Sequence, residues 1–287
     1  MSVSNTSGGR YQYNTLVLLY IYGILKYFEG GVMKEILAVK NIMQKYQADN
    51  GEILAIEDIS FGVNQGEIVS IVGPSGSGKS TLLSIISGLL KPTYGEIRLN
   101  GEKIESVSSN IGYMLQKDYL LEWRTIYSNV MFGLEIQGNI NEESKEYVDR
   151  LLNAYGLYEF KEKYPSQLSG GMRQRAALIR TLATNPTILL LDEAFSALDY
   201  QTRIVVTEDV YKILRGENKT TIMVTHDISE AVSMADKVIV LTNRPSKIKA
   251  VHNIQFENEG TPLQRRDDPI FRKYYNEIWR ELDVNIK

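Results

Sequence analysis

The chain has 287 residues, of which 43% are hydrophobic and 23% charged, as is ordinary for a globular protein of one or two domains. Its 32 basic and 35 acidic residues nearly cancel, so no global charge favours nucleic acid as a partner. The lack of cysteine excludes disulfides, thiolate metal sites and cysteine nucleophiles, and two histidines are too few for a multi-histidine metal site.

An apolar run near the start, residues 16–28, raises the question of a membrane or export signal. The run is shorter than the ~20 residues of a spanning helix, and no small-residue cleavage site follows it. Residues 29–33 are what a ribosome-binding site followed by a start codon would encode. We therefore favour the hypothesis that residues 1–32, an N-terminal extension, are not translated, over a disordered arm or a membrane-surface helix. The domain is then expected to start at Met33.

The first elements predicted in the domain are strands. Alternating polar and apolar residues at 36–43 and 52–63 indicate β-strands, and residues 66–72 form an apolar strand that runs into a glycine-rich loop. Residues 81–90 then indicate a buried helix. Further apolar runs, which indicate strands buried on both faces, occupy 188–191, 221–225 and 238–241. Strands of this kind alternating with helices favour a mainly parallel α/β core.

Two helices with an apolar face are predicted elsewhere. Residues 141–155 carry apolar side chains at helical spacing, and Gly156 suits the end of that helix. Near the C-terminus, Asp268 can cap a helix and Pro269 fits its first turn. The apolar stripe of this tail helix consists of Ile270, Phe271, Tyr274, Tyr275, Ile278, Trp279 and Leu282. The stripe either docks on the domain's own core, which we favour, or faces a partner.

The glycine-rich loop after the strand at 66–72 matches the pattern G-x-x-x-x-G-K-[ST], which binds nucleotide phosphates. Its residues are Gly73, Pro74, Ser75, Gly76, Ser77, Gly78, Lys79, Ser80 and Thr81. Glycines let backbone N–H groups converge on phosphate, and the following helix directs its positive end there. Lys79 would supply a charge to the β- and γ-phosphates and Ser80 a hydroxyl to Mg²⁺. A glycine-rich turn without a ligand is the alternative, which the strand–loop–helix context disfavours. The predicted cofactors are ATP and Mg²⁺.

Two carboxylates, Asp192 and Glu193, follow the apolar run at 188–191. Ligands of open α/β sheets bind at the carboxyl ends of the strands, so we expect both side chains beside the phosphate loop. Asp192 is predicted to hold Mg²⁺, and Glu193 to act as the general base on the water that attacks the γ-phosphate. An ordinary acidic loop is the alternative, which the phosphate loop disfavours.

A second anion-binding helix start is predicted at residues 168–175 (LSGGMRQR). Ser169, Gly170 and Gly171 open a helix there, and backbone N–H groups at a helix start bind anions. Because the chain already has one phosphate loop, this second site is expected to serve another nucleotide. A capped surface helix is the alternative.

With these motifs in this order, residues 33–245 resemble an ABC transporter ATPase. The resemblance implies an α/β P-loop fold with a mainly parallel sheet, an antiparallel β subdomain and a helical subdomain that carries the LSGGMRQR signature. It also implies a head-to-tail homodimer, in which the signature of one copy closes over the ATP that the other copy holds.

The resemblance assigns roles to further single residues. Gln116 matches the Q-loop glutamine, which senses Mg²⁺ and the attacking water, and Asp199 matches the D-loop aspartate, which contacts the partner subunit. His226 matches the switch histidine at the γ-phosphate, and its place between a strand and a helix start directs it to the ligand edge of the sheet. Tyr46 matches the aromatic residue that stacks on adenine, with a surface tyrosine as the alternative.

Residues 120–126 are similar to a stretch in importers of nitrate, aliphatic sulfonates, taurine and thiamine-precursor pyrimidines. The turn at 243–245 and the tail at 265–269 also suit that branch, whereas Glu122 and Ala194 stand where proline is common. The branch implies a separate transmembrane permease, an extracytoplasmic substrate-binding protein and a location at the cytoplasmic face of the membrane.

The implied organisation after the extension is a core with its β subdomain at 33–115, a helical subdomain at 116–172, the continued core at 173–245, and a C-terminal strand and amphipathic helix at 246–287. Two other functions stay open: a non-transport ABC ATPase on DNA or the ribosome, and a protein that holds ATP without hydrolysing it. The single cassette and the lack of a long coiled-coil insertion disfavour the first. The presence of both hydrolytic groups disfavours the second.

Overall fold

A computed structural model describes residues 34–48, 51–257 and 260–282. Contacts divide the chain into two compact units, residues 1–34 and 35–287, and the second unit holds all the elements below. The N-terminal extension predicted at 1–32 lies outside the described residues. Within the described part of the chain, no helix is both long and apolar enough to cross a membrane.

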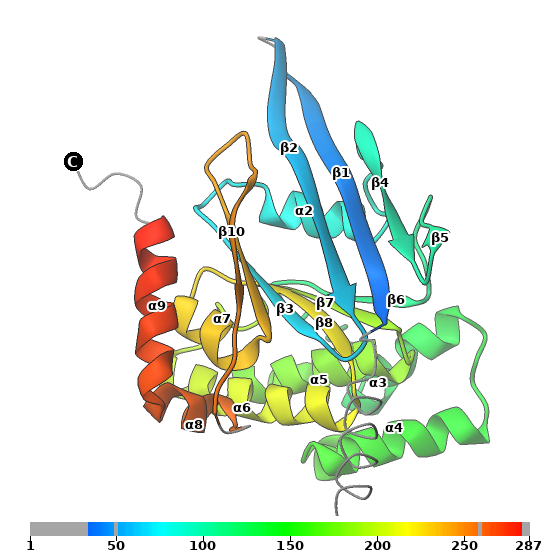
Figure 1. The fold of residues 1–287 in the computed structure, drawn as a ribbon. Helices are drawn as coiled ribbons and strands as arrows, with labels where there is room; N and C mark the ends of the chain where they lie inside the picture. Colours follow the sequence, from blue (N-terminus) through cyan, green and yellow to red (C-terminus); the bar gives the residue numbers. More distant parts are fainter. Residues whose placement is uncertain (1–33, 49–50, 258–259, 283–287) are drawn as a thin grey trace, which may run out of the picture. The chain divides into compact units, whose positions relative to one another are not determined.

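Two β-sheets form the framework of the larger unit (Figure 1). An antiparallel sheet of four strands has the order β2-β1-β4-β5, formed by Gly51–Asn64, Glu35–Ala48, Tyr94–Leu99 and Glu102–Lys103. A sheet of six strands has the order β10-β9-β3-β8-β7-β6, formed by Ile248–Asn253, Lys237–Leu241, Ile68–Val72, Thr220–Val224, Ile188–Asp192 and Ile111–Met114. All neighbours in the second sheet are parallel except β10 and β9. The predicted mainly parallel core and antiparallel β subdomain are therefore confirmed.

The central strands are buried on both faces, which explains their uninterrupted apolar sequences. In β3, Ile68 and Val72 join one hydrophobic cluster, while Val69 and Ile71 join another. The second cluster also contains α2 (Lys79–Ile86) and the inner face of the antiparallel sheet. The helix that follows the phosphate loop thus lies between the two sheets, with its start at the ends of the parallel strands.

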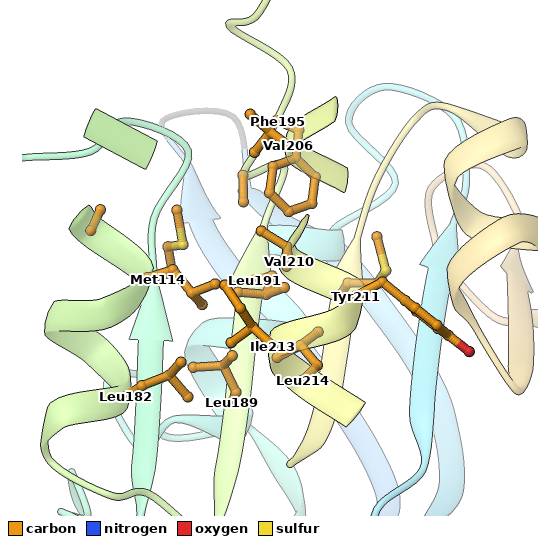
Figure 2. Packing of buried hydrophobic residues seen from close by; sticks show 14 of the residues in the cluster. Met114, Leu182, Leu189, Leu191, Phe195, Val206, Val210, Tyr211, Ile213 and Leu214 are labelled. Atoms are coloured by element: carbon orange, nitrogen blue, oxygen red, sulfur yellow. The ribbon is translucent and has the colours of Figure 1, made fainter. Parts of the chain in front are cut away.

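Helices cover the opposite face of the parallel sheet. They are α3 (Ile126–Ile136), α4 (Glu142–Ala154), α5 (Gly170–Ala183), α6 (Tyr200–Gly216) and α7 (Ile228–Met234), with the 3₁₀ turns η1 (Tyr158–Phe160) and η2 (Pro165–Gln167). Figure 2 shows part of this core, where Leu182 of α5, Leu189 and Leu191 of β7, and Val210 and Leu214 of α6 gather beside the sheet. Burying one such side chain contributes roughly 1.5–3 kcal/mol.

The C-terminal segment packs back onto the core. After α8 (Pro262–Asp267), the Asp268 side chain accepts a hydrogen bond from the N–H of Ile270 at 2.9 Å and begins α9 (Pro269–Leu282). Ile278 is fully buried in the core, and Phe271, Tyr274, Tyr275 and Leu282 of the predicted stripe pack against the same hydrophobic cluster. The stripe therefore docks on the domain's own core, as favoured from the sequence, although Trp279 stays half exposed.

Several elements differ from their predicted limits. The helix predicted at 81–90 ends at Ile86, because Gly88 adopts a left-handed backbone with φ of 77° and turns the chain. Strands β4, β5 and β6 and helices α3, α6 and α8 were not predicted individually. The subdomain boundaries inferred from the sequence stay predictions, and α5 runs across the one placed after residue 172.

Candidate functional site

Parallel pairing brings the carboxyl ends of β3, β8, β7 and β6 to one edge of the sheet. The segments that follow these strands carry Lys79, His226, Glu193 and Gln116, in the same order. A cleft of about 450 Å³ opens at this edge. Its lining consists of Ser75, Gly76, Gly78, Lys79, Ser80, Thr81, Glu193, His226 and Arg244.

The phosphate loop owes its shape to two glycines with left-handed backbone angles. Gly76 has φ of 75° and Gly78 has φ of 88°, conformations that disfavour residues with a Cβ. The buried Lys79 lies over the loop, and its Nζ donates hydrogen bonds of 2.9 Å to the carbonyls of Gly73 and Pro74. Burial lowers the pKa of Lys79, and the nearby carboxylates of Glu193 and Asp192 oppose that shift. The loop thus presents a cation and backbone N–H groups together.

Ser77 is a second polar side chain of the loop that is buried. Its hydroxyl is buried and has no hydrogen-bond partner among the described residues. A Cβ at Gly73 would lie only 2.9 Å from that hydroxyl, so the first position of the loop also requires glycine. Ser75 is exposed at the rim of the cleft.

Two oxygen ligands suited to a hard cation lie side by side in the cleft. Ser80 Oγ donates to Asp192 Oδ1 at 3.1 Å, and Tyr113 donates to the other carboxylate oxygen at 3.2 Å. Burial raises the pKa of Asp192, and these two hydrogen bonds oppose the rise. No group of three or more His, Cys, Asp or Glu that could hold a metal exists within the described residues. A serine hydroxyl beside a carboxylate would suit Mg²⁺, which takes few protein ligands and keeps water and phosphate oxygens.

Glu193 occupies a strained backbone position beside that pair. Its φ is 46°, in the left-handed region, and its N–H donates to the carbonyl of Val224 at 2.9 Å. Glu193 Oε2 lies 3.4 Å from Gln116 Nε2 and 3.5 Å from His226 Nδ1. The structure thus brings together the three residues that the sequence predicts to be catalytic, with Gln116 and His226 both beside one carboxylate oxygen of Glu193.

Gln116 also connects this carboxylate to the segment that contains Asp199. Gln116 Nε2 donates to Ser196 Oγ at 3.1 Å, and Ser196 Oγ donates to the carbonyl of Glu193 at 2.9 Å. Gln116 therefore contacts both Glu193 and the segment that leads to α6.

Tyr46 reaches the phosphate loop from the antiparallel sheet. Its hydroxyl donates to Thr81 Oγ1 at 3.2 Å, and its side chain is 39% exposed. The ring is therefore accessible beside the start of α2, although its stacking on adenine stays a prediction.

The signature residues lie apart from this cleft. Ser169 accepts a hydrogen bond from the N–H of Met172 at 3.3 Å and begins α5; Ser169 and Gly170 are exposed, whereas Gly171 is buried. Gly170 lines a different cleft of about 310 Å³. Asp199 caps α6 by accepting from the N–H of Thr202 at 3.1 Å. Neither the signature nor Asp199 lines the cleft of Lys79, so their roles at a nucleotide and at a partner subunit stay predictions.

Three residues at or near the site were not predicted as site residues. Tyr113 orients Asp192, Arg203 bonds the segment before α6, and Arg244 lines the cleft. Tyr113 and Arg244 lie on or after strands that end at the ligand edge, which is the signal that would have found them.

Comparisons with known proteins point to one family. The ABC transporter family model matches residues 56–196. An uncharacterized ABC transporter ATP-binding protein of Bacillus subtilis, YtlC, is 44% identical over 86% of this chain and 95% of its own length. The taurine import ATP-binding protein TauB of a Jannaschia species is 39% identical over 84% of this chain and 92% of its own. The nitrate import ATP-binding protein NrtD of a Synechocystis species is 38% identical, with 84% and 93% coverage.

A solved structure agrees with this result. The ATP-binding cassette MJ0796, in a dimeric post-hydrolysis state bound to ADP and Pi, is 32% identical with a TM-score of 0.66, and the match covers 77% of this chain and 100% of that one. Sequence family, relatives and fold agree. The chain belongs to the ABC transporter family, as an ATP-binding and ATP-hydrolysing subunit.

Proposed function

We propose that this chain powers the import of a small anion, such as nitrate, taurine or another sulfonate, or of a thiamine-precursor-like pyrimidine, through a separate permease. Similarity to taurine and nitrate import ATP-binding proteins over more than nine-tenths of their lengths supports this branch. The observation that carries the enzymatic part is the cleft in which Gln116 and His226 surround the carboxylate of Glu193.

Phosphate binding falls to the loop at 73–81, whose glycines and Lys79 present backbone N–H groups and a cation. Mg²⁺, held by Ser80 and Asp192 with Gln116 nearby, would neutralise phosphate charge. The Glu193 carboxylate takes a proton from the attacking water, and the His226 imidazole contacts the γ-phosphate. Tyr46 stacks on the adenine. Catalysis is then mostly positioning and charge stabilisation.

A second copy of the chain completes the site. Ser169, Gly170 and Gly171 of one copy approach the phosphates held by the other, and Asp199 contacts the partner. The exposure of Ser169 and its place at the start of α5, where N–H groups face outward, support this arrangement.

The permease is proposed to dock beside residues 120–126, at the cytoplasmic face of the membrane. Trp123 in this segment is 74% exposed, and large exposed apolar side chains are typical of interaction surfaces. An extracytoplasmic binding protein would deliver the substrate to the permease. The chain itself contributes no part of the substrate pocket in this proposal.

The test is uptake in a strain that lacks the gene. Labelled nitrate, taurine, an alkanesulfonate and a pyrimidine precursor are supplied in turn, and the gene is returned as wild type or as Glu193→Gln. We expect wild type, and not the variant, to restore uptake of one class of compound. Unchanged uptake of all four compounds would contradict the import proposal. Co-purification with ribosomes or DNA in place of a permease would favour the non-transport alternative.

A further inference from the structure

The loop after β9 reaches the same edge of the sheet as the catalytic residues. Strand β9 pairs in parallel with β3, so the end of β9 at Leu241 lies beside the end of β3 at Val72. Two backbone hydrogen bonds anchor the far side of this loop to β2: Ser246 N–H donates to the Ala55 carbonyl at 3.0 Å, and Glu57 N–H donates to the Ser246 carbonyl at 2.9 Å. The loop therefore holds Arg244 at a defined place.

Arg244 directs its guanidinium at the middle of the phosphate loop. Its Nη2 donates to the carbonyl of Gly76 at 3.1 Å, and Arg244 lines the cleft together with Lys79. A Cβ built at Gly76 would be 4.0 Å from Nη2, so the guanidinium lies beside the face that glycine leaves open. The bond to Gly76 uses one of the five N–H donors of a guanidinium.

The charge balance of the cleft favours a role in anion binding. Among the residues that line it, Lys79 and Arg244 are the basic side chains with a cationic head group, and Glu193 is the acidic one. Lys79 is buried and bonds the loop carbonyls, whereas Arg244 is exposed. An arginine at a phosphate site can donate parallel hydrogen bonds to phosphate oxygens, which a lysine cannot.

We propose that Arg244 is a nucleotide-binding residue that donates to the phosphates held by the middle of the loop. The inference rests on the proposed assignment of residues 73–81 as the phosphate loop. Backbone N–H groups of such a loop hold the α- and β-phosphates, and Lys79 reaches toward the γ-phosphate. Arg244, next to Gly76, therefore contacts phosphates that ATP and ADP share. Arg244 therefore contributes equally to the binding affinity for ATP and for ADP.

Three substitutions separate a charged contact from a structural bond to the loop. Arg244→Ala removes both, Arg244→Gln keeps a donor for the Gly76 carbonyl without the charge, and Arg244→Lys keeps the charge without the planar fork. Lys247→Ala is the matched control, because Lys247 is an exposed cation on the same loop that pairs with Glu57 at 3.0 Å. The dissociation constants of fluorescent ATP and ADP analogues with Mg²⁺ are measured for the purified full chain.

We expect Arg244→Ala and Arg244→Gln to raise the dissociation constants of both nucleotides by about 3- to 10-fold. The effect is modest because solvent partly screens the charge of Arg244. Arg244→Lys should recover part of the affinity, and Lys247→Ala should bind as wild type. Unchanged thermal unfolding without nucleotide would show that the variants are folded.

Wild-type affinity in Arg244→Ala or in Arg244→Gln would overturn the proposal, the latter because a structural bond alone would then suffice. A loss confined to ATP would also overturn it. Lys79→Ala, tested in parallel, distinguishes a failure of the Arg244 assignment from a failure of the phosphate-loop assignment. If Lys79→Ala loses binding while Arg244→Ala does not, only the role of Arg244 fails. If Lys79→Ala binds ATP normally, the phosphate-loop assignment itself fails.

Discussion

The carboxylate of Glu193 is held by the segments after β6, β7 and β8, and its backbone has a left-handed φ of 46°. Such a conformation costs of order 1–3 kcal/mol for a residue with a Cβ and persists only where neighbouring structure enforces it. The hydrogen bond from its N–H to the Val224 carbonyl is part of that enforcement. In this conformation Glu193 lines the cleft together with Lys79.

Replacing Glu193 by Gln should slow hydrolysis strongly and spare ATP binding. The amide keeps the shape but cannot accept the proton of the attacking water, so we expect turnover to fall by about 100-fold or more. The dissociation constant of ATP should change by less than about twofold, because the phosphate loop is intact. Steady-state phosphate release and nucleotide titration measure the two quantities. Glu143→Gln, at an exposed position of α4, is the control. Wild-type turnover in Glu193→Gln would rule this residue out as the base.

Glu230, four residues after His226, links stability to pH. Burial raises the pKa of this carboxyl from 4.5 to about 8, and the carboxylate of Asp227 adds to the rise, while Arg203 and Arg266 oppose it. The pKa of Glu230 is higher in the folded protein than in the unfolded chain. The protonated carboxyl therefore contributes its full stabilisation of the fold below about pH 4.5, and this stabilisation is lost as the pH rises through about 8.

A glutamine at this position cannot ionise, so the free energy of unfolding of Glu230→Gln should not fall with pH in this way. Between pH 6 and pH 9, we expect wild type to lose on the order of 2 kcal/mol relative to the variant. Urea unfolding of both proteins at the two pH values measures the difference, and all other titrating groups are common to both. Parallel pH profiles would show that Glu230 does not stay protonated in the fold.

At the scale of elements, Arg203 at the start of α6 joins two segments of the site. Its Nη2 donates to the Leu198 carbonyl at 2.9 Å and to the Ser196 carbonyl at 3.4 Å, and its Nη1 lies 3.5 Å from Asp227 Oδ2. Asp227 follows His226 and caps α7. One guanidinium therefore holds the segment before Asp199 and the segment that carries the proposed switch histidine.

Loss of this connection should slow hydrolysis more than binding. In Arg203→Ala we expect turnover at saturating ATP to fall about 10-fold, because small displacements of positioning groups are costly. The dissociation constant of ATP should change by less than about twofold, since Arg203 does not line the cleft. Arg203→Lys should recover part of the rate. Wild-type turnover in Arg203→Ala would contradict this role.

At the scale of the whole molecule, one copy presents a phosphate loop in one place and a signature helix start in another. Ser169 does not line the cleft of Lys79, and it is exposed. The MJ0796 cassette, to which this chain is similar, is dimeric in its solved structure. A closed head-to-tail pair would unite the two half-sites and explain why both are exposed in one copy.

The substitution Ser169→Arg should prevent dimer formation without preventing ATP binding. We expect Glu193→Gln to form dimers with ATP, because slow hydrolysis preserves the closed pair. The double variant Glu193→Gln with Ser169→Arg should stay monomeric, since a long side chain blocks the helix start. It should still bind ATP at its own phosphate loop. Light scattering after size exclusion measures the dimer, and nucleotide titration measures ATP binding. Dimers of the double variant would contradict the predicted interface.

The sequence alone determined the α/β class, the glycine-rich loop at 73–81 and the two carboxylates at the end of β7. These features are local: a motif of nine consecutive residues sets the loop, and an uninterrupted apolar run predicts a strand buried on both faces. The caps at Asp268 and Ser169 are also local, because each involves a helix start and the residues just before it.

Only the tertiary structure decided which distant residues meet. The contacts of Arg244 with Gly76, of Arg203 with Asp227 and of Tyr113 with Asp192 depend on strand order and side-chain reach. Strand order in a parallel sheet follows from how helices cover its two faces, and no short pattern records that choice. For the same physical reason, the short strands β4 and β5 were missed, since pairing with a neighbouring strand, and not their own sequence, stabilises them.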